Sequence, residues 1–198
     1  MGIDMESFAV PLHADPVRAI RADPVLWEAA SEHPPFCRAW PGEALPSISQ
    51  ALVAVLPTGG NWVQHFVDRS QQQAEYLLDP VAYREVQAWQ DRESSMAYRI
   101  IHGYEVFADH AVSGQGFRWR CSTKVFLTAA ADQVDNLDIA AVRREFSVAE
   151  MAELGLYKVH PDEDDDHAFG RVLAQLRAFA GHCRHVVAQD LDLIVSQY

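Results

Sequence analysis

The clearest structural signal in the chain is the stretch FGRVLAQLRAFAGHC, residues 169–183. Apolar side chains recur in it at intervals of three and four residues, which gives a helix one apolar face. In the following residues 190–195, every second residue is leucine or valine, an alternation typical of a strand. This part of the chain therefore predicts a long helix followed by a closing strand.

The N-terminal part carries a matching strand signal. Apolar residues alternate over residues 2–10, and Pro11 ends the pattern, so we expect a strand that pairs with the closing one. Two Ala-Asp-Pro-Val segments follow, at residues 14–17 and 22–25. Each places Asp at an N-cap and Pro at the first helical position, which predicts two short helices. Several prolines in residues 32–46 then predict a long loop.

The middle of the chain contains further helix and strand signals. Apolar periodicity and capping residues predict helices at residues 47–56, 61–67, 79–89 and 96–101 and helix starts at Thr128, Asp138 and Ser147. Alternation predicts a pair of strands at residues 104–108 and 117–121. We therefore expect a single α+β domain over residues 1–198, with a small, mostly antiparallel sheet packed against several helices.

Charge limits the classes of partner. The chain has 198 residues, with 16 Lys and Arg against 28 Asp and Glu, and its formal net charge is −12. Nucleic-acid backbones and anionic membrane surfaces are bound by clustered basic residues, so we predict neither as a partner. No apolar run approaches the length of a membrane-spanning helix.

The cysteines and the first residues indicate the compartment. Cys37, Cys121 and Cys183 lie far apart and form no paired motif, which favours a reducing environment. The N-terminal residues have an acid where a signal peptide has basic residues. We therefore predict a cytoplasmic protein. Dinucleotide, phosphate-loop and nucleophile-elbow motifs are all missing from the sequence, and we predict no cofactor.

The order of landmarks along the chain resembles the YfbM-like family of uncharacterised bacterial proteins, a domain of unknown function. The resemblance covers most of the chain and is closer from about Gly116 onward. It rests on Met1-Gly2, Phe8-Ala9, Trp62 with His65-Phe66, Leu127-Thr128, Val134, Leu137-Asp138, Phe146-Ser147, Met151, Leu156-Tyr157, and the last helix and strand. It implies an α+β fold and a bacterial cytoplasmic protein, and it implies no reaction.

The most interesting polar set lies in the segment of residues 61–69. It comprises Asn61, Gln64, His65, Asp68 and Arg69, directly after a Gly-Gly turn, and the candidate ligand-binding residues of this segment are Asn61, Trp62, His65 and Arg69. On a helix, the spacing brings His65, Asp68 and Arg69 together, so that Asp68 orients His65 as a general base. The alternative is that these polar residues pair with neighbours while Trp62 and Phe66 anchor the core.

The densest group of charges precedes the last helix. The run Asp162 to Asp166 is flanked by His160 and His167. Its carboxylates, with Asp162, Asp164 and Asp166 as candidate ligands, suit a hard cation, and the histidines extend the choice to transition metals. The alternative is that acids gather at this helix start because its free N–H groups and dipole favour negative charge.

Three weaker candidates remain. His182, Cys183 and His185 lack a fourth ligand for zinc, and Cys183 continues the apolar face of the helix. Cys121 is a nucleophile only if His102 or His110 meets it across the strand pair. An exposed aromatic patch for a partner can include some of Trp27, Trp40, Trp89, Trp119, Tyr76, Tyr83, Tyr98 and Tyr104.

Two functional hypotheses follow. The first is a non-catalytic protein-binding or regulatory module whose acidic surface speeds association with a basic protein. Neutralisation of a basic toxin by an immunity-like protein is a special case by analogy alone, and self-association into a homodimer stays open. The second is a small-ligand-binding protein or a hydrolase-type enzyme, with its site near Trp62, His65, Asp68 and Arg69.

Overall fold

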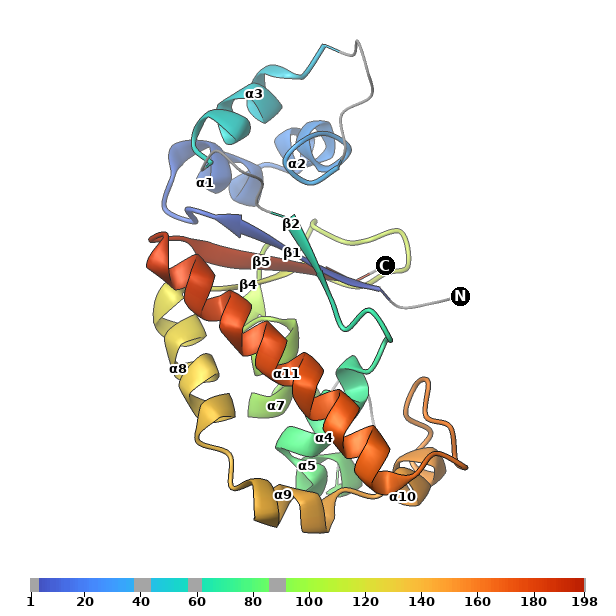
Figure 1. The fold of residues 1–198 in the computed structure, drawn as a ribbon. Coiled ribbons are helices and arrows are strands. Elements are labelled where there is room, and N and C mark those ends of the chain that lie inside the picture. The colour runs from blue at the N-terminus through green and yellow to red at the C-terminus, as the bar shows by residue number, and fades with distance from the viewer. Residues whose placement is uncertain (1–3, 38–43, 57–61, 86–91, 198) are drawn as a thin grey trace.

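Figure 1 shows the computed structural model, which describes residues 4–37, 44–56, 62–85 and 92–197. At its centre is an antiparallel sheet with the strand order β2-β1-β5-β4-β3. The strands are β1 (Met5–Val10), β2 (Trp62–His65), β3 (Glu105–Val106), β4 (Arg120–Ser122) and β5 (Asp192–Gln197). β5 lies between β1 and β4, and it pairs with β1 from Met5↔Gln197 to Val10↔Asp192. The predicted pairing of the first and closing strands is confirmed.

Three helices cover one face of the sheet: α1 (Asp15–Ala22), α2 (Pro24–Ser31) and α3 (Ser47–Ala54). The Asp23 carboxylate caps α2 by accepting a hydrogen bond from the Val25 N–H at 2.8 Å, as the sequence predicts. The predicted cap at Asp15 is wrong, because Asp15 lies in the first turn of α1 and Ala14 is the N-cap. Beneath these helices lie the buried aromatic side chains Phe8, Trp27, Phe36, Phe107 and Trp119, which we call the aromatic cluster. Ring centroids within it lie 4.9–5.7 Å apart.

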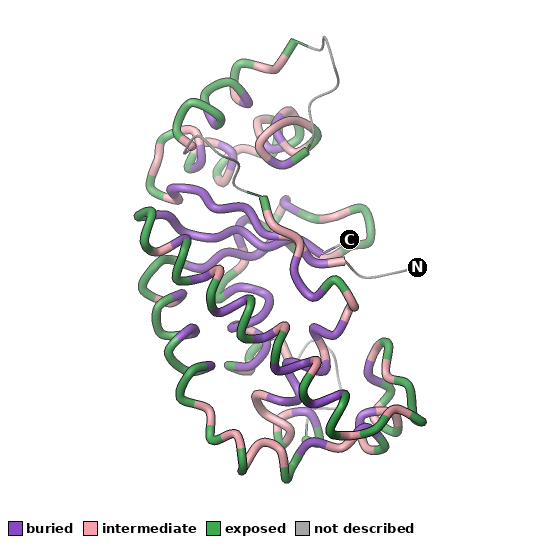
Figure 2. Tube along the Cα trace, viewed as in Figure 1, coloured by how far each residue is buried: buried purple, intermediate pink, exposed green. Residues whose placement is uncertain are grey.

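The other face carries the remaining helices. They are α4 (Gln71–Leu78), α5 (Pro80–Glu85), α7 (Met96–His102), α8 (Lys124–Asp135), α9 (Ile139–Glu145), α10 (Val148–Glu153) and α11 (Asp165–Ala188). The long helix α11 runs diagonally below the sheet and packs against α8 and α4 (Figure 1). Figure 2 shows burial repeating along α11 on its inner side. This stripe includes the predicted positions Phe169, Val172, Leu173, Leu176, Phe179, Ala180 and Cys183.

Two further local predictions are wrong and one helix was not predicted, each for a physical reason. Residues 62–65 form strand β2 instead of a helix, because the free edge of β1 offers them a full ladder from Met5↔His65 to Phe8↔Trp62. Helix α4 is not apparent from periodicity because Gln71, Gln73 and Glu75 are buried in it. The helix predicted to start at Thr128 starts at Lys124, and the Thr128 hydroxyl donates to the Lys124 carbonyl within it.

Other differences concern element boundaries. The central strand pair is shorter than predicted, with Glu105–Val106 paired to Arg120–Cys121. The predicted helix at 79–89 is seen as α5 up to Glu85, and its later residues lie outside the described part. Asp138 and Ser147 cap α9 and α10 as predicted. Together these elements form the predicted α+β fold.

No helix among the described residues is long and apolar enough to cross a lipid bilayer.

Candidate functional site

The structure separates the polar residues predicted to act together at positions 61–69. Asn61 lies outside the described residues. Trp62 is exposed at the strand end, so it does not anchor the core, whereas Phe66 is buried. Because residues 62–65 form a strand, His65 faces the α11 side of the sheet opposite Met5. Asp68 binds other groups and does not orient His65.

His65 meets a serine and a second histidine instead. The Ser7 hydroxyl on β1 lies 2.7 Å from His65 Nε2 and 3.3 Å from His182 Nε2 on α11. Burial, and to a smaller extent the neighbouring His182, lowers the pKa of His65 from 6.5 to about 3. Burial likewise lowers the pKa of His182 to about 4. Ser7 is completely buried, so a substrate cannot reach this hydroxyl in the observed conformation.

Asp68 and Arg69 both form ion pairs with distant parts of the chain. Arg69 donates from Nε and Nη2 to the two Asp4 oxygens at 3.0 and 3.1 Å. The Asp68 carboxylate accepts from the Ser70 hydroxyl at 2.6 Å and from Arg171 on α11. Arg171 also donates to both Glu163 oxygens, at 3.2 and 3.1 Å. The two predicted polar groups, at residues 61–69 and 160–167, are therefore joined through Arg171.

A hollow of about 480 Å³ lies where these two groups meet. It is lined by Asp68, Lys158, His160, Asp162, Glu163, His167 and Arg171. Left-handed backbone φ values occur beside it at Phe66 (47°), Arg69 (62°) and Lys158 (57°), where side chains other than glycine are strained. The hollow contains anionic and cationic groups in a mixed arrangement.

The acidic run has partners that account for its position. Asp164 caps α11 by accepting from the His167 N–H at 3.0 Å, and Asp165 accepts from the Val148 N–H at 2.8 Å. Asp166 pairs with Arg143 at 2.7 Å. In the described part of the chain, no three His, Cys, Asp or Glu side chains are arranged to hold a metal ion. The geometry matches acids that stabilise a helix start.

The two buried cysteines, Cys121 and Cys183, are poorly placed for chemistry. Burial raises the pKa of Cys121 and of Cys183 to about 12, which keeps both as thiols at neutral pH. His102 is bonded to Glu75, and His110 Nε2 lies 3.0 Å from the Ile20 carbonyl. The hydrogen-bond partner of the Cys121 thiol in the described part of the chain is Glu105 Oε1 at 3.8 Å, and neither histidine takes that place.

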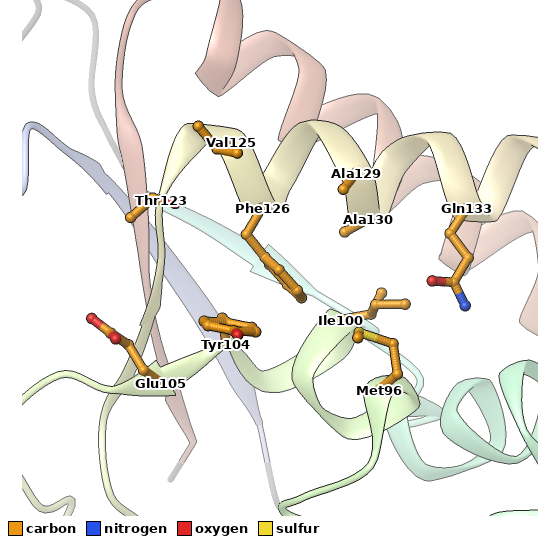
Figure 3. A pocket seen from close by; sticks show the side chains of 10 residues that line it. All are labelled: Met96, Ile100, Tyr104, Glu105, Thr123, Val125, Phe126, Ala129, Ala130 and Gln133. Carbon is orange, nitrogen blue, oxygen red and sulfur yellow. The ribbon is translucent and has the colours of Figure 1, made fainter.

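An apolar hollow lies between α7 and α8, and we call it the α7–α8 groove. It has a volume of about 510 Å³. Figure 3 shows its lining residues, which are Met96, Ile100, Tyr104, Glu105, Thr123, Val125, Phe126, Ala129, Ala130 and Gln133. Most of them are apolar, and a few polar groups stand at the margins, which is the usual composition of a binding site.

Local sequence features place the groove. Ser95 caps α7 by accepting from the Tyr98 N–H at 3.1 Å, and Gly103 ends it with a φ of +106°. A Cβ atom at Gly103 would lie 2.9 Å from the Arg120 Cβ, so the chain can turn beside β4 only with glycine there. The Tyr104 ring that follows packs at a tilt against the Phe126 ring, with centroids 4.5 Å apart.

The rim of the α7–α8 groove is exposed. Val125 is 77% exposed, Met96 48% and Tyr104 43%. Tyr104 is the member of the predicted aromatic patch that is exposed, while Trp27, Trp119, Tyr76, Tyr83 and Tyr98 are buried and Trp40 and Trp89 lie outside the described residues. The sequence did not reveal the groove. One signal was available, because Val125 is an apolar residue that does not share the helical spacing of the buried positions Leu127, Ala131 and Val134 of the same helix.

The fold of the chain is similar to that of a protein of known structure. No family model matches the chain, and no curated protein matches it. Among solved structures, it is similar to YfbM from Escherichia coli, a protein of unknown function. The similarity covers 98% of this chain and 99% of that chain, with a TM-score of 0.59 and 11% sequence identity. The chain therefore has the fold of YfbM, as the resemblance in its sequence predicts.

Proposed function

We propose that this chain is a protein-binding module and that the α7–α8 groove receives an amphipathic helix of a basic partner. The observation that carries the proposal is the exposed apolar rim of Val125, Met96 and Tyr104 around an apolar floor. Water-exposed apolar side chains gathered in one place mark interaction surfaces. Covering them supplies the binding free energy.

The shape of the groove favours a helix as the occupant. α8 has 12 residues and forms one wall, so at 1.5 Å per residue the wall is roughly 18 Å long. Ala129 and Ala130 line this wall and leave room for a helix backbone to approach. A small molecule on the floor would leave Val125 exposed, whereas a helix along α8 would cover it. Helices bind such grooves through apolar residues at i, i+3, i+4 and i+7.

Charge favours a basic partner. The net charge of −12 gives the molecule a negative field that attracts cationic segments. Such attraction raises the association rate more than it raises the affinity, and salt weakens it. We therefore expect apolar residues to hold the partner and acidic residues of this chain to speed its arrival.

A designed peptide tests the proposal. The probe is a fluorescent helix of leucine and lysine with leucines at i, i+3, i+4 and i+7, titrated while anisotropy is recorded. Val125→Asp should weaken binding at least about tenfold, because a carboxylate would have to be buried in the interface. The matched control is Val25→Asp, at an exposed valine on α2 across the sheet, which should bind like the native chain.

Three outcomes would overturn the proposal. Equal binding by Val125→Asp and Val25→Asp would show that the peptide does not use the groove. Absence of binding at low salt would exclude the helix as occupant. Sedimentation showing a native dimer that Val125→Asp converts to a monomer would assign the groove to a second copy of this chain.

A further inference from the structure

A second hollow lies on the opposite side of α7, where the turn before β4 meets the end of β5. Its volume is about 340 Å³. The side chains that matter to its chemistry are Glu93, Tyr98, Phe117, Arg118, Arg120 and Gln197. Unlike the α7–α8 groove, it contains two guanidinium groups, and we call it the arginine hollow.

The two arginines share one acceptor atom. Glu93 Oε2 accepts from Arg118 Nη2 at 3.2 Å and from Arg120 Nη1 at 3.3 Å. Both distances are long for a charge-assisted hydrogen bond, which is usually near 2.8 Å. Two cations facing one carboxylate leave the described part of this hollow with a positive charge. This contrasts with a net charge of −12 for the whole chain.

Burial makes that positive charge costly. Arg120 is only 6% exposed, whereas Arg118 at the rim is 48% exposed at its side chain. Burial lowers the pKa of Arg120 even with Tyr98 and Glu93 beside it, and the nearby Arg118 and Arg99 lower it further. A second anion in the arginine hollow would offset the cost of holding Arg120 charged.

The groups around Arg120 are fixed in place before any ligand arrives. Arg120 donates from Nε to the Gly103 carbonyl at 2.9 Å and from Nη2 to the Tyr104 carbonyl at 3.2 Å. These bonds leave Nη1 for Glu93 or a competing anion. The Arg120 guanidinium also lies 5.2 Å from the centre of the Tyr98 ring, within range of a cation–π contact.

A buried hydrogen-bonded chain supports the back of the hollow. The Gln197 amide lines the hollow and contacts His102 Nδ1. His102 Nε2 in turn lies 2.6 Å from Glu75 Oε1, and both of these side chains are 1% exposed. The Tyr98 ring packs on His102 with centroids 4.3 Å apart. Side chains held in this way need little ordering on binding, which favours affinity.

We propose that the arginine hollow binds a small organic anion whose carboxylate or phosphate takes the place of Glu93 between Arg118 and Arg120. The apolar part of this ligand packs against the rings of Tyr98 and Phe117. Glu93 then acts as a built-in competitor that occupies the arginines while the ligand is absent. Arginine suits this role because its planar fork matches carboxylate and phosphate oxygens.

The test is calorimetric titration of the full chain at constant ionic strength, with benzoate and inorganic phosphate as separate probes and chloride as the balancing ion. Glu93→Gln removes the competing charge while conserving the side-chain shape. It should bind one of the probes at least about tenfold more tightly than the native chain. Benzoate binding would identify a carboxylate ligand, and phosphate binding a phosphate ligand.

A control distinguishes binding in the arginine hollow from general electrostatic attraction to the protein. Arg118→Ala should weaken binding at least about tenfold, whereas Arg177→Ala, which removes an exposed arginine of α11, should not. Equal affinities of Glu93→Gln and the native chain, or equal losses in the two arginine variants, would overturn the proposal. If Glu93→Gln does not fold, native binding lost only in Arg118→Ala supports the site, and a native chain that binds neither probe overturns it.

Discussion

On one face of the sheet, α1, α2 and α3 enclose the five rings of the aromatic cluster, and we call this the aromatic face. On the other face, which we call the polar face, the helices enclose the titratable side chains His65, Glu75 and His102 within a larger apolar core. The strands set this division, because alternate residues of β1 point to opposite faces. Phe8 joins the aromatic cluster, and Ser7 contacts His65. Neighbouring residues of one strand therefore serve two different environments, aromatic packing on one face and a buried serine–histidine contact on the other.

The largest expected effect tests the aromatic face. Trp27→Ala removes a buried ring whose centroid lies 4.9 Å from Trp119 and 5.7 Å from Phe107. We expect a loss of about 3–5 kcal/mol in the free energy of unfolding, because a large cavity remains. Urea denaturation measures it, with exposed Val25→Ala on the same helix as the control. A loss below about 1 kcal/mol would contradict tight packing on this face.

The next effect tests the polar face. Glu75→Ala should cost about 3 kcal/mol, because His102 Nε2 and the Tyr83 hydroxyl lose a buried acceptor. The double variant Glu75→Leu with His102→Leu should lose less than the summed losses of Glu75→Leu and His102→Leu, because it leaves neither of these two side chains without the other as partner. Strictly additive losses in urea denaturation would show that the two side chains do not interact.

The free energy of unfolding should depend on pH through the polar face, with an effect of intermediate size. The pKa of His65 falls from 6.5 to about 3 on folding, chiefly through burial, so the unfolded chain binds the proton more readily. The associated stability is therefore present above pH 6.5 and is lost as pH falls toward 3. Between pH 7 and 5 the loss is about 2 kcal/mol for this group.

His65→Gln sharpens this prediction. The variant keeps a hydrogen-bonding group for Ser7 and should lose about 2 kcal/mol less between pH 7 and 5 than the native chain. Exposed His160→Gln is the matched control and should retain the native pH dependence. Identical slopes for all three chains would place the acid sensitivity elsewhere.

The smallest expected change in stability concerns the α7–α8 groove. Val125→Asp should change the free energy of unfolding by less than about 0.5 kcal/mol, because the valine side chain already faces water. A thermal melt beside Val25→Asp measures the difference. A loss of more than about 2 kcal/mol would show that Val125 belongs to the core of the polar face.

Much of the fold follows from local signals. The apolar face of α11 and the caps at Asp23, Asp138 and Ser147 each depend on neighbours within a few residues, so the sequence predicts them. Strand β2 depends on β1, which is more than 50 residues away, and its four residues fit a helical period as well as a strand. A short pattern cannot decide between the two without its partner.

The candidate sites depend even more on distant contacts. Asp68 meets Arg171, and Arg120 meets Glu93, only after the helices have packed. The prediction that His65, Asp68 and Arg69 act together assumes a helix, and the strand separates them. Val125 alone offered a local signal, as an apolar residue on the outer side of α8.

The central position of β5 has a consequence for how the chain folds. Residues 192–197 supply the ladder that joins β1 to β4, although β1 and β5 are separated by more than 180 residues. During synthesis, the ribosome releases β1 and β4 long before the strand that connects them. The sheet therefore closes late, and the high contact order of this pairing favours slow folding. A ribosome-bound chain that ends before residue 192 would expose the edges of β1 and β4 that later pair with β5. Unpaired strand edges of this kind bind chaperones and promote aggregation.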